Sequence, residues 1–397
     1  MKNAFQCSNI VKRYDGKTVL DGVSLRTQAG DFFLLAGGNG AGKTVFLRAA
    51  AGIEEIDSGM FAMNGEDVTS MRPRLRGATL LPARDTLWPH LNATENITFP
   101  LRNNGATADI ATRAAREALL ALSLEQCSAR LPCALSDSER LRLAIASMIA
   151  ITPRLLLLDD AFATCAPDLR MSLLRFLKNY AAKNNLPLIA ATANPAAFLP
   201  FADQVAVMDC GKILQCGTPL EVYHRPTSRR SAATLGAVNV VEGTLLHAGA
   251  GEFVARTPLG DLRGALANPA ANPPPGTLLD LLIRPESLHV DAFPPEENAF
   301  PATPIPDAPP QAHDKTNTRV RLQERIGDLS ADNSENTAVS EYHGATAIHR
   351  YRTSDGTTLR VLGTNPHTTT LPAQSAAASP LFLWVAPEDI TGALRAQ

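Results

Sequence analysis

The stretch DFFLLAGGNGAGKTVFLRAAAG, residues 31–52, decides the fold. An apolar run typical of a buried strand ends at Ala36, the glycine-rich turn GGNGAGKT follows at residues 37–44, and a helix-like segment continues from it. This order predicts a loop whose backbone N–H groups surround a polyphosphate, beside the positive end of a helix dipole. An ordinary glycine-rich turn is the weaker alternative, because the strand and the helix flank the loop as the motif requires.

Two side chains at the end of this loop have the chemistry of nucleotide binding. Lys43 can reach the β and γ phosphates, and the Thr44 hydroxyl can take one coordination place of Mg²⁺. The sequence therefore predicts a site for ATP and Mg²⁺. The candidate nucleotide-binding residues of the loop are Gly37, Gly38, Asn39, Gly40, Ala41, Gly42, Lys43, Thr44 and Val45.

A second carboxylate is expected on a neighbouring strand, and the run LLLLDDAFATCA, residues 155–166, supplies it. Asp159 ends an apolar strand, where it can hold Mg²⁺ together with Thr44. An aspartate at a strand end is often only a turn residue. The loop at residues 37–44 makes the metal role the better hypothesis.

The length of 397 residues predicts more than one domain, because single cores stop growing at about 250–300 residues. Composition is that of a globular protein, with 45% hydrophobic and 19% charged residues and a net charge of −2. That balance argues against a general nucleic-acid binder. The first residues lack the apolar core of a signal peptide, and no run is long enough to span a membrane, so we expect a cytoplasmic protein.

The pattern of apolar runs and of Gly and Pro residues changes near residue 235. Before it, apolar runs alternate with helix-like segments, with strands expected at residues 32–36, 155–158, 187–192 and 204–208. After it, short strand-like runs separated by Gly and Pro predict a small β-rich module. The segment 291–316 is rich in proline and is predicted to be a disordered loop. TAIHRYRTSDGTTLRVLG, residues 346–363, is typical of a hairpin, and the similar runs LLIRPESLHV and LFLWVAPEDI suggest paired elements of one barrel.

The order of these segments resembles the ATP-binding subunits of ABC importers that carry a C-terminal transport-associated OB module, the polyamine, iron and sugar group. YDGKTVLDGVSL (residues 14–25), LWPHLNATEN (87–96), GKILQCGTPLEVYHRP (211–226) and LLIRPESL (281–288) are similar to motifs of that family. The resemblance implies an α/β P-loop NTPase domain at residues 1–235, with a helical subdomain at about 84–150, and an OB-like β domain at residues 236–397. It also implies that Tyr14 stacks on adenine.

Five motifs of the family are changed in this sequence. Ala83 aligns with the Q-loop glutamine, Asp160 with the glutamate that polarises the attacking water, Ala166 with the D-loop aspartate and Ala193 with the switch histidine. The signature LSGGQ reads LSDSE at residues 135–139, where Ser136 and Glu139 predict a capping box for the following helix. Asp160 is thus the one candidate catalytic residue, one methylene shorter than the family's acid. These changes predict a site that binds nucleotide and hydrolyses it poorly.

The implied function is coupling of ATP binding, and of any hydrolysis, to transport through membrane permease subunits that dock near residues 84–96. The implied partners are those permeases, a second ATP-binding subunit in a homodimer or heterodimer, and indirectly a substrate-binding protein. The implied location is the cytoplasmic face of the membrane, and the cargo is a polyamine or iron. The alternatives are a pseudo-ATPase that acts as a structural or regulatory partner, and a soluble ABC ATPase of DNA repair or translation.

Overall fold

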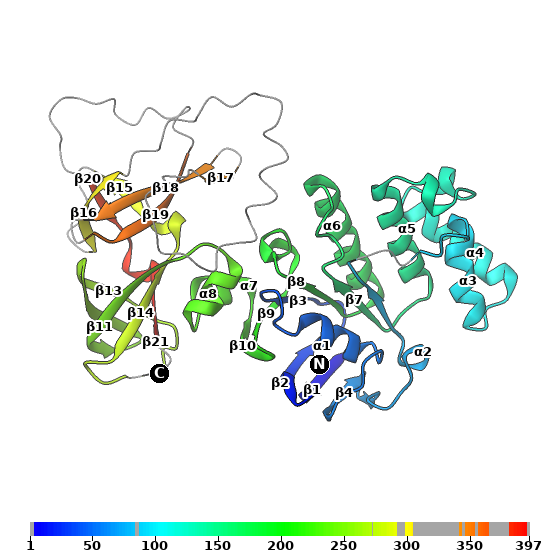
Figure 1. The fold of residues 1–397 in the computed structure, drawn as a ribbon, viewed down its shortest axis with the longest axis horizontal. Coiled ribbons are helices and arrows are strands. Elements are labelled where there is room, and N and C mark those ends of the chain that lie inside the picture. The colour runs from blue at the N-terminus through cyan, green and yellow to red at the C-terminus, as the bar shows by residue number, and fades with distance from the viewer. Residues whose placement is uncertain are drawn as a thin grey trace. The chain divides into compact units, whose positions relative to one another are not determined.

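The chain divides into two compact units, Met1–Gly236 and Ala237–Gln397. The computed structural model describes residues 4–83, 87–271, 273–291, 298–304, 341–343, 346–353, 356–364 and 381–394. Figure 1 labels the elements of both units. Each unit has a hydrophobic core of its own.

The first unit alternates strands and helices. Its strands are β1 (Phe5–Tyr14), β2 (Lys17–Thr27), β3 (Phe32–Ala36), β4 (Ser58–Met63), β5 (Glu66–Asp67), β6 (Ala78–Leu81), β7 (Leu155–Asp159), β8 (Leu188–Thr192), β9 (Gln204–Asp209) and β10 (Lys212–Gly217). Its α-helices are α1 (Lys43–Ala50), α2 (Pro73–Arg76), α3 (Ala93–Asn103), α4 (Ala108–Ala121), α5 (Asp137–Ala150), α6 (Pro167–Asn184), α7 (Pro219–His224) and α8 (Arg229–Leu235).

A six-stranded sheet in the order β10-β9-β3-β8-β7-β6 forms the centre of the first unit. It is parallel except for β10, which pairs antiparallel with β9. Both faces of the sheet are buried. Phe32 and Leu34 point into one core and Phe33 and Leu35 into another, so the strands are apolar at every position. The strands predicted at residues 32–36, 155–158, 187–192 and 204–208 are confirmed as β3, β7, β8 and β9.

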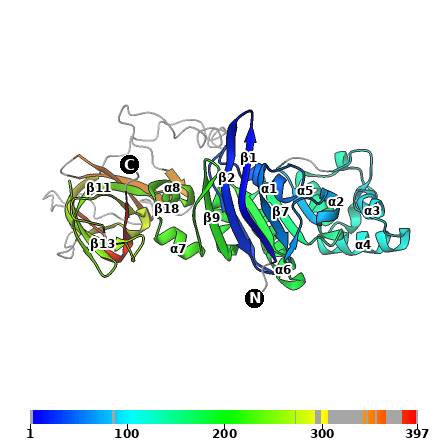
Figure 2. The ribbon, with the colours of Figure 1, turned by 90° about the horizontal axis from the view of Figure 1, so that it is seen from below.

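Helix α1 lies between the central sheet and a second, antiparallel sheet in the order β2-β1-β4-β5, as Figure 2 shows. Phe46 and Leu47 of α1 are fully buried between the two sheets. The buried Arg76 caps the far end of the helix, since its Nη1 donates to the carbonyl oxygens of Ala49 and Ala50 at 2.6 and 3.2 Å. Helix α1 is therefore held along its length by the two sheets and at its far end by Arg76.

Helices α3, α4 and α5 gather at one end of the first unit (Figure 1). Both α3 and α5 begin with a capping box, formed by Asn92 with Glu95 and by Ser136 with Glu139. The capping box predicted at Ser136 and Glu139 is confirmed. No helix in the described part of the chain has the length and apolar character that a membrane crossing requires.

The second unit contains a closed barrel, β11-β12-β13-β21-β14, which fits the predicted OB-like module. A second sheet runs in the order β15-β20-β16-β18-β17, and β19 pairs with β18. Phe253 fills the barrel interior, where Gly264 and Gly392 leave room for its ring. The strands are β11 (Asn239–Gly249), β12 (Glu252–Thr257), β13 (Gly260–Leu266), β14 (Leu278–Ile283), β15 (His289–Asp291), β16 (Ala299–Pro304), β17 (Glu341–His343), β18 (Thr346–Thr353), β19 (Thr358–Thr364), β20 (Leu381–Trp384) and β21 (Ile390–Leu394).

Two sequence expectations for the second unit need correction. The runs LLIRPESLHV and LFLWVAPEDI do pair, but in two sheets and not in one barrel: β14 pairs with β21, and β15 with β20. A 3₁₀ turn that begins with proline, Pro285–Ser287 or Pro387–Asp389, interrupts each run and redirects the chain.

The predicted hairpin of β18 and β19 is confirmed by their antiparallel pairing, although Asp355 of its turn lies outside the described residues.

The prediction of disorder for residues 291–316 is wrong for Ala299–Pro304. These residues form β16, which pairs with β18 and β20. Partner strands distant in sequence supply the pairing, which composition does not reveal. Residues 292–297 and 305–316 of the same segment lie outside the described residues.

The barrel predicts a steric test at Gly392. A Cβ atom added there would lie 2.6 Å from the Phe253 ring, so Gly392→Ala should destabilise the second unit by about 1–3 kcal/mol through overpacking. Adding Phe253→Leu should recover part of the loss. Chemical denaturation followed by circular dichroism measures both effects. Gly249→Ala, where an added Cβ has no neighbour within 4 Å, is the matched control. Equal stability of the two alanine variants would contradict the packing account.

Candidate functional site

The loop at residues 37–42 joins the carboxyl end of β3 to the first turn of α1, at the edge of the parallel sheet. A Cβ at residue 37 would lie 2.3 Å from the Met208 carbonyl oxygen, so only glycine fits there. Gly42 has φ +104° and lies against the Val19 carbonyl. By contrast, Cβ atoms at Gly38 and Gly40 would meet nothing within 4 Å. The loop is thus packed on its inner side and open on its outer side, as a phosphate cradle requires.

Lys43 is 6% exposed and spans the loop from within. Its Nζ donates to the carbonyl oxygens of Gly37 at 2.7 Å and Gly38 at 2.9 Å. Burial lowers the pKa of this amine, and the carboxylates of Asp160 and Asp159 oppose that effect only in part. Because a buried cation needs compensating negative charge, an anion in the cradle would stabilise Lys43.

Thr44 and Asp159 meet across the same edge of the sheet. The Thr44 hydroxyl donates to Asp159 Oδ1 at 2.9 Å, and the carboxylate ends β7 with 7% exposure. Burial raises the pKa of Asp159, and the hydrogen bond from Thr44 works against that rise. A hydroxyl oxygen and a carboxylate oxygen side by side form the hard oxygen set that Mg²⁺ prefers. The donor set therefore fits the predicted metal.

Asp160 follows β7 and is hydrogen-bonded to the end of β8. Its backbone has φ +48°, a left-handed conformation that aspartate adopts more readily than most residues. Its N–H donates to the Ala191 carbonyl at 2.9 Å, and its Oδ1 accepts the Ala193 N–H at 3.3 Å. The carboxylate of Asp160 is thus directed at the end of β8, in contact with the backbone where the resemblance places a histidine.

The other three divergent positions carry no polar side chain. Ala83 and Ala193 are exposed. Ala166 is the N-cap of α6 and caps it with no side-chain hydrogen bond, although aspartate is among the best residues for that position. None of the three can orient a water molecule or bind a phosphate through its side chain.

At the start of α5, the capping box occupies the serine hydroxyl. Ser136 Oγ donates to Glu139 Oε2 at 2.7 Å and accepts the Glu139 N–H at 3.3 Å. The Ser136 N–H donates to the same carboxylate at 2.8 Å. These hydrogen bonds lower the pKa of Glu139 to about 2, and the bond from the Ser136 backbone N–H has the largest effect. The helix therefore begins with a negatively charged side chain.

Tyr14 ends β1 and is 40% exposed. Lys12 Nζ lies 4.9 Å from the centroid of its ring and 3.2 Å from Glu54 Oε1. The sequence predicts a role for Tyr14 through the resemblance, whereas its neighbours Lys12 and Glu54 became apparent only in the structure. The spacing of Lys12, two residues before Tyr14 in a strand, was the one signal that could have found it.

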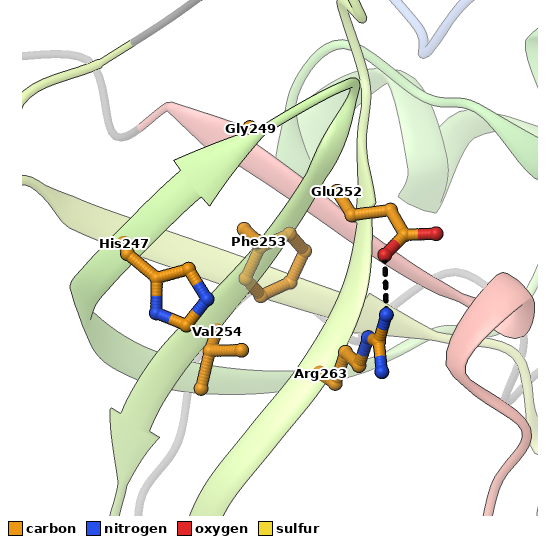
Figure 3. A pocket seen from close by; sticks show the side chains of 6 residues that line it. All are labelled: His247, Gly249, Glu252, Phe253, Val254 and Arg263. Carbon is orange, nitrogen blue, oxygen red and sulfur yellow. Dashed lines mark hydrogen bonds and ion pairs between the residues drawn. The ribbon is translucent and has the colours of Figure 1, made fainter.

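Two hollows lie outside this site. One, of about 400 Å³, is at the far end of α1 and is lined by Glu54, Glu55, Arg72 and Arg76 among others. The other, of about 340 Å³, lies on the barrel of the second unit (Figure 3). Arg263 Nη2 and Glu252 Oε2 pair at 2.7 Å on one side of Val254, and His247 lies on the other side. Neither contains any of the residues that the sequence analysis predicted to bind nucleotide or metal.

Comparisons with known proteins agree with this geometry. The sequence model of the ABC transporter family matches residues 20–163. The chain is 31% identical to the spermidine/putrescine import ATP-binding protein PotA of Thermotoga maritima over 283 residues, 71% of this chain and 76% of the relative. It is 33% identical to PotA of Escherichia coli K12 over 72% of this chain and 75% of the relative.

Further relatives agree in sequence or in fold. The chain is 35% identical to the sn-glycerol-3-phosphate import ATP-binding protein UgpC 1 of Rhizobium johnstonii, over 59% of this chain and 64% of the relative. Its fold is similar to an ATP-binding cassette of an ABC transporter in its ADP conformation, with TM-score 0.51 and 21% identity over 56% of this chain and 95% of that one. It is also similar to CbiO1 from Clostridium perfringens, with TM-score 0.52 and 23% identity over 56% and 91%.

The raised pKa of Asp159 predicts a pH dependence of stability. Because burial raises the folded pKa above the unfolded value of about 3.9, the stability that Asp159 contributes is present below that value and is lost as pH rises through the folded pKa. From about pH 4 upward, without nucleotide or metal, native protein should therefore lose stability relative to Asp159→Asn until the folded pKa is passed. Urea denaturation in EDTA across this range measures the difference. Asp109→Asn, at an exposed site in α4, is the control, and parallel curves for all three proteins would contradict the prediction.

Proposed function

Because the chain belongs to the ATP-binding subunits of ABC importers, we propose that it binds MgATP at residues 37–45 and couples the bound nucleotide to membrane permease subunits. The observation that carries the proposal is Lys43, a buried amine inside an open loop, whose hydrogen bonds among the described residues go to two neutral carbonyls. The residues that would hold the phosphates are Gly37, Gly38, Asn39, Gly40, Ala41, Gly42, Lys43, Thr44 and Val45.

The metal would be held by Thr44 and Asp159, whose oxygens are 2.9 Å apart. When bound, Mg²⁺ neutralises phosphate charge and fixes the orientation of the chain of phosphates. Lys43 and the N-terminus of α1 supply the remaining positive field. These residues bind and orient the nucleotide, and none of them needs to transfer a proton.

We propose that the chain hydrolyses ATP slowly. The second candidate function is therefore that of a nucleotide-binding partner subunit with little turnover. A general base must reach the attacking water, whereas the Asp160 carboxylate accepts a hydrogen bond from the Ala193 N–H. Misplacement of a reacting group by about 1 Å can cost about 10²-fold in rate. Ala83 and Ala193 offer no side chain that could replace the lost contacts.

The start of α5 bears on the dimer. The resemblance to the family implies that ATP lies between the loop of one subunit and the signature motif of its partner. Here the Ser136 hydroxyl already donates to Glu139, and Asp137, 93% exposed and paired with Arg140, adds a second carboxylate. Like charges in a poorly hydrated interface repel γ-phosphate. We therefore favour a heterodimer in which the partner supplies an intact signature to the loop of this chain.

The permeases would dock on α3 and the segment before it. Trp88 and Phe99 form an edge-to-face pair with centroids 5.1 Å apart, and Phe99 is 42% exposed. Trp88 is half-buried, so the pair presents mainly Phe99 to solvent, and exposed aromatic side chains are a common feature of docking surfaces. Such docking would place the chain at the cytoplasmic face of the membrane. The names of two relatives favour a polyamine cargo over iron, and the cargo would be selected by the permeases and a binding protein.

The first test separates binding from turnover. Isothermal titration should show MgATP binding by the full chain, while phosphate release stays near background, with and without permeases, because Asp160 and Ala193 cannot activate water. Lys43→Ala should abolish binding, and Lys183→Ala, exposed in the last turn of α6, should not. Turnover that depends on Lys43 at about 10 s⁻¹, a common enzyme rate, would contradict the weak-hydrolysis proposal. Absence of MgATP binding would contradict nucleotide binding itself.

The second test concerns the dimer. With MgATP, the native chain alone should remain monomeric in analytical ultracentrifugation. Asp137→Gly combined with Glu139→Gln should dimerise, because it removes two carboxylates from the phosphate-facing end of α5. The matched control removes two exposed acids from α4, Asp109→Gly with Glu117→Gln. A native homodimer as tight as that of the variant would contradict the proposed heterodimer.

A further inference from the structure

The exposed ring of Tyr14 rests on a charged pair. Lys12 Nζ lies 4.9 Å from the ring centroid and 3.2 Å from Glu54 Oε1. The side chains of Lys12 and Glu54 are only 13% and 22% exposed, whereas Tyr14 is 40% exposed. The pair is therefore more buried than the ring that it contacts, and the ring keeps a large share of its surface exposed.

Two contacts fix the orientation of this ring. The cation of Lys12 holds one face through a cation–π interaction. The carboxylate of Glu54 interacts with the Tyr14 hydroxyl. Burial is the largest cause of the raised pKa of Tyr14, and the interaction with Glu54 is the second. The same interaction is the largest cause of the lowered pKa of Glu54. A ring held at its face and at its hydroxyl loses less conformational freedom when a planar group stacks on it.

The pair also connects the ring to the helix that begins at the phosphate loop. The Glu54 N–H donates to the Arg48 carbonyl of α1 at 3.2 Å, and the Asp57 N–H donates to the Val11 carbonyl of β1 at 2.9 Å. The segment 53–57 is thus bonded to both elements. The charge of Arg48 acts on Tyr14, on Glu54 and on Asp159. Charge on α1 therefore acts both on the ring and on Asp159, the candidate metal ligand.

We propose that Lys12 and Glu54 are positioning residues for the nucleobase, which hold the Tyr14 ring so that a purine stacks on its exposed surface. The proposal rests on the proposed nucleotide binding and adds two residues that act only on the base. Neither residue reaches the phosphate loop through any hydrogen bond or ion pair recorded among the described residues. Their loss should therefore weaken recognition of the base and leave recognition of the phosphates unchanged.

The test compares MgATP with magnesium tripolyphosphate, which has the phosphates and no base, on the full-length chain by isothermal titration. Lys12→Met should raise the Kd of MgATP by about fivefold, the size of one cation–π contact, and Glu54→Gln should raise it as well. Each should change the Kd of tripolyphosphate by less than about twofold on the same scale. Lys12→Arg, which keeps a cation over the ring, should restore MgATP binding.

The matched controls are Lys183→Met in α6 and Glu55→Gln, the exposed neighbour of Glu54, and both should bind the two ligands as native protein does. Unchanged MgATP binding in Lys12→Met and Glu54→Gln would overturn the proposal, and so would equal losses for both ligands. Equal affinity of native protein for the two ligands would also overturn it, since the base would then add nothing. If native protein bound neither ligand, the nucleotide site itself would fall.

Discussion

Burial of both faces of the central parallel sheet is the constraint on which the first unit depends. Phe32 and Leu34 enter one core and Phe33 and Leu35 the other, so β3 is held from two sides. Because β3, β8 and β7 run parallel and adjacent, their carboxyl ends lie at one edge of the sheet. Lys43, Asp159 and Ala193, far apart in sequence, meet there for that reason alone.

At that edge the groups that we propose hold phosphate and metal are placed differently from the groups that would activate water. Lys43 faces the inside of the loop, and Thr44 bonds Asp159. One residue further along β7, the backbone of Asp160 turns to positive φ and its carboxylate bonds the Ala193 N–H. The exchange of a longer acid for aspartate thus coincides with a new structural role, in which the carboxylate joins β7 to β8.

Helix α1 connects distant parts of this site. Its first turn contains Lys43, and the segment after its last turn carries Glu54, whose carboxylate interacts with the Tyr14 hydroxyl. Arg76 and Gly52 fix that far end, since a Cβ at residue 52 would lie 2.9 Å from the guanidinium. Phosphate loop and aromatic ring are therefore held at the two ends of one packed helix.

The sequence by itself determined the features that depend on neighbours along the chain. The glycine pattern at residues 37–44, the apolar run before Asp159 and the spacing of Ser136 and Glu139 each specify a local backbone structure, and each was predicted and found. Only the tertiary structure decided which groups meet across the chain. Asp160 with Ala193, Lys12 with Glu54, and β16 with its two partner strands are pairings set by packing and strand order. The physical reason is that such contacts join residues far apart in sequence, whose distance no local pattern encodes.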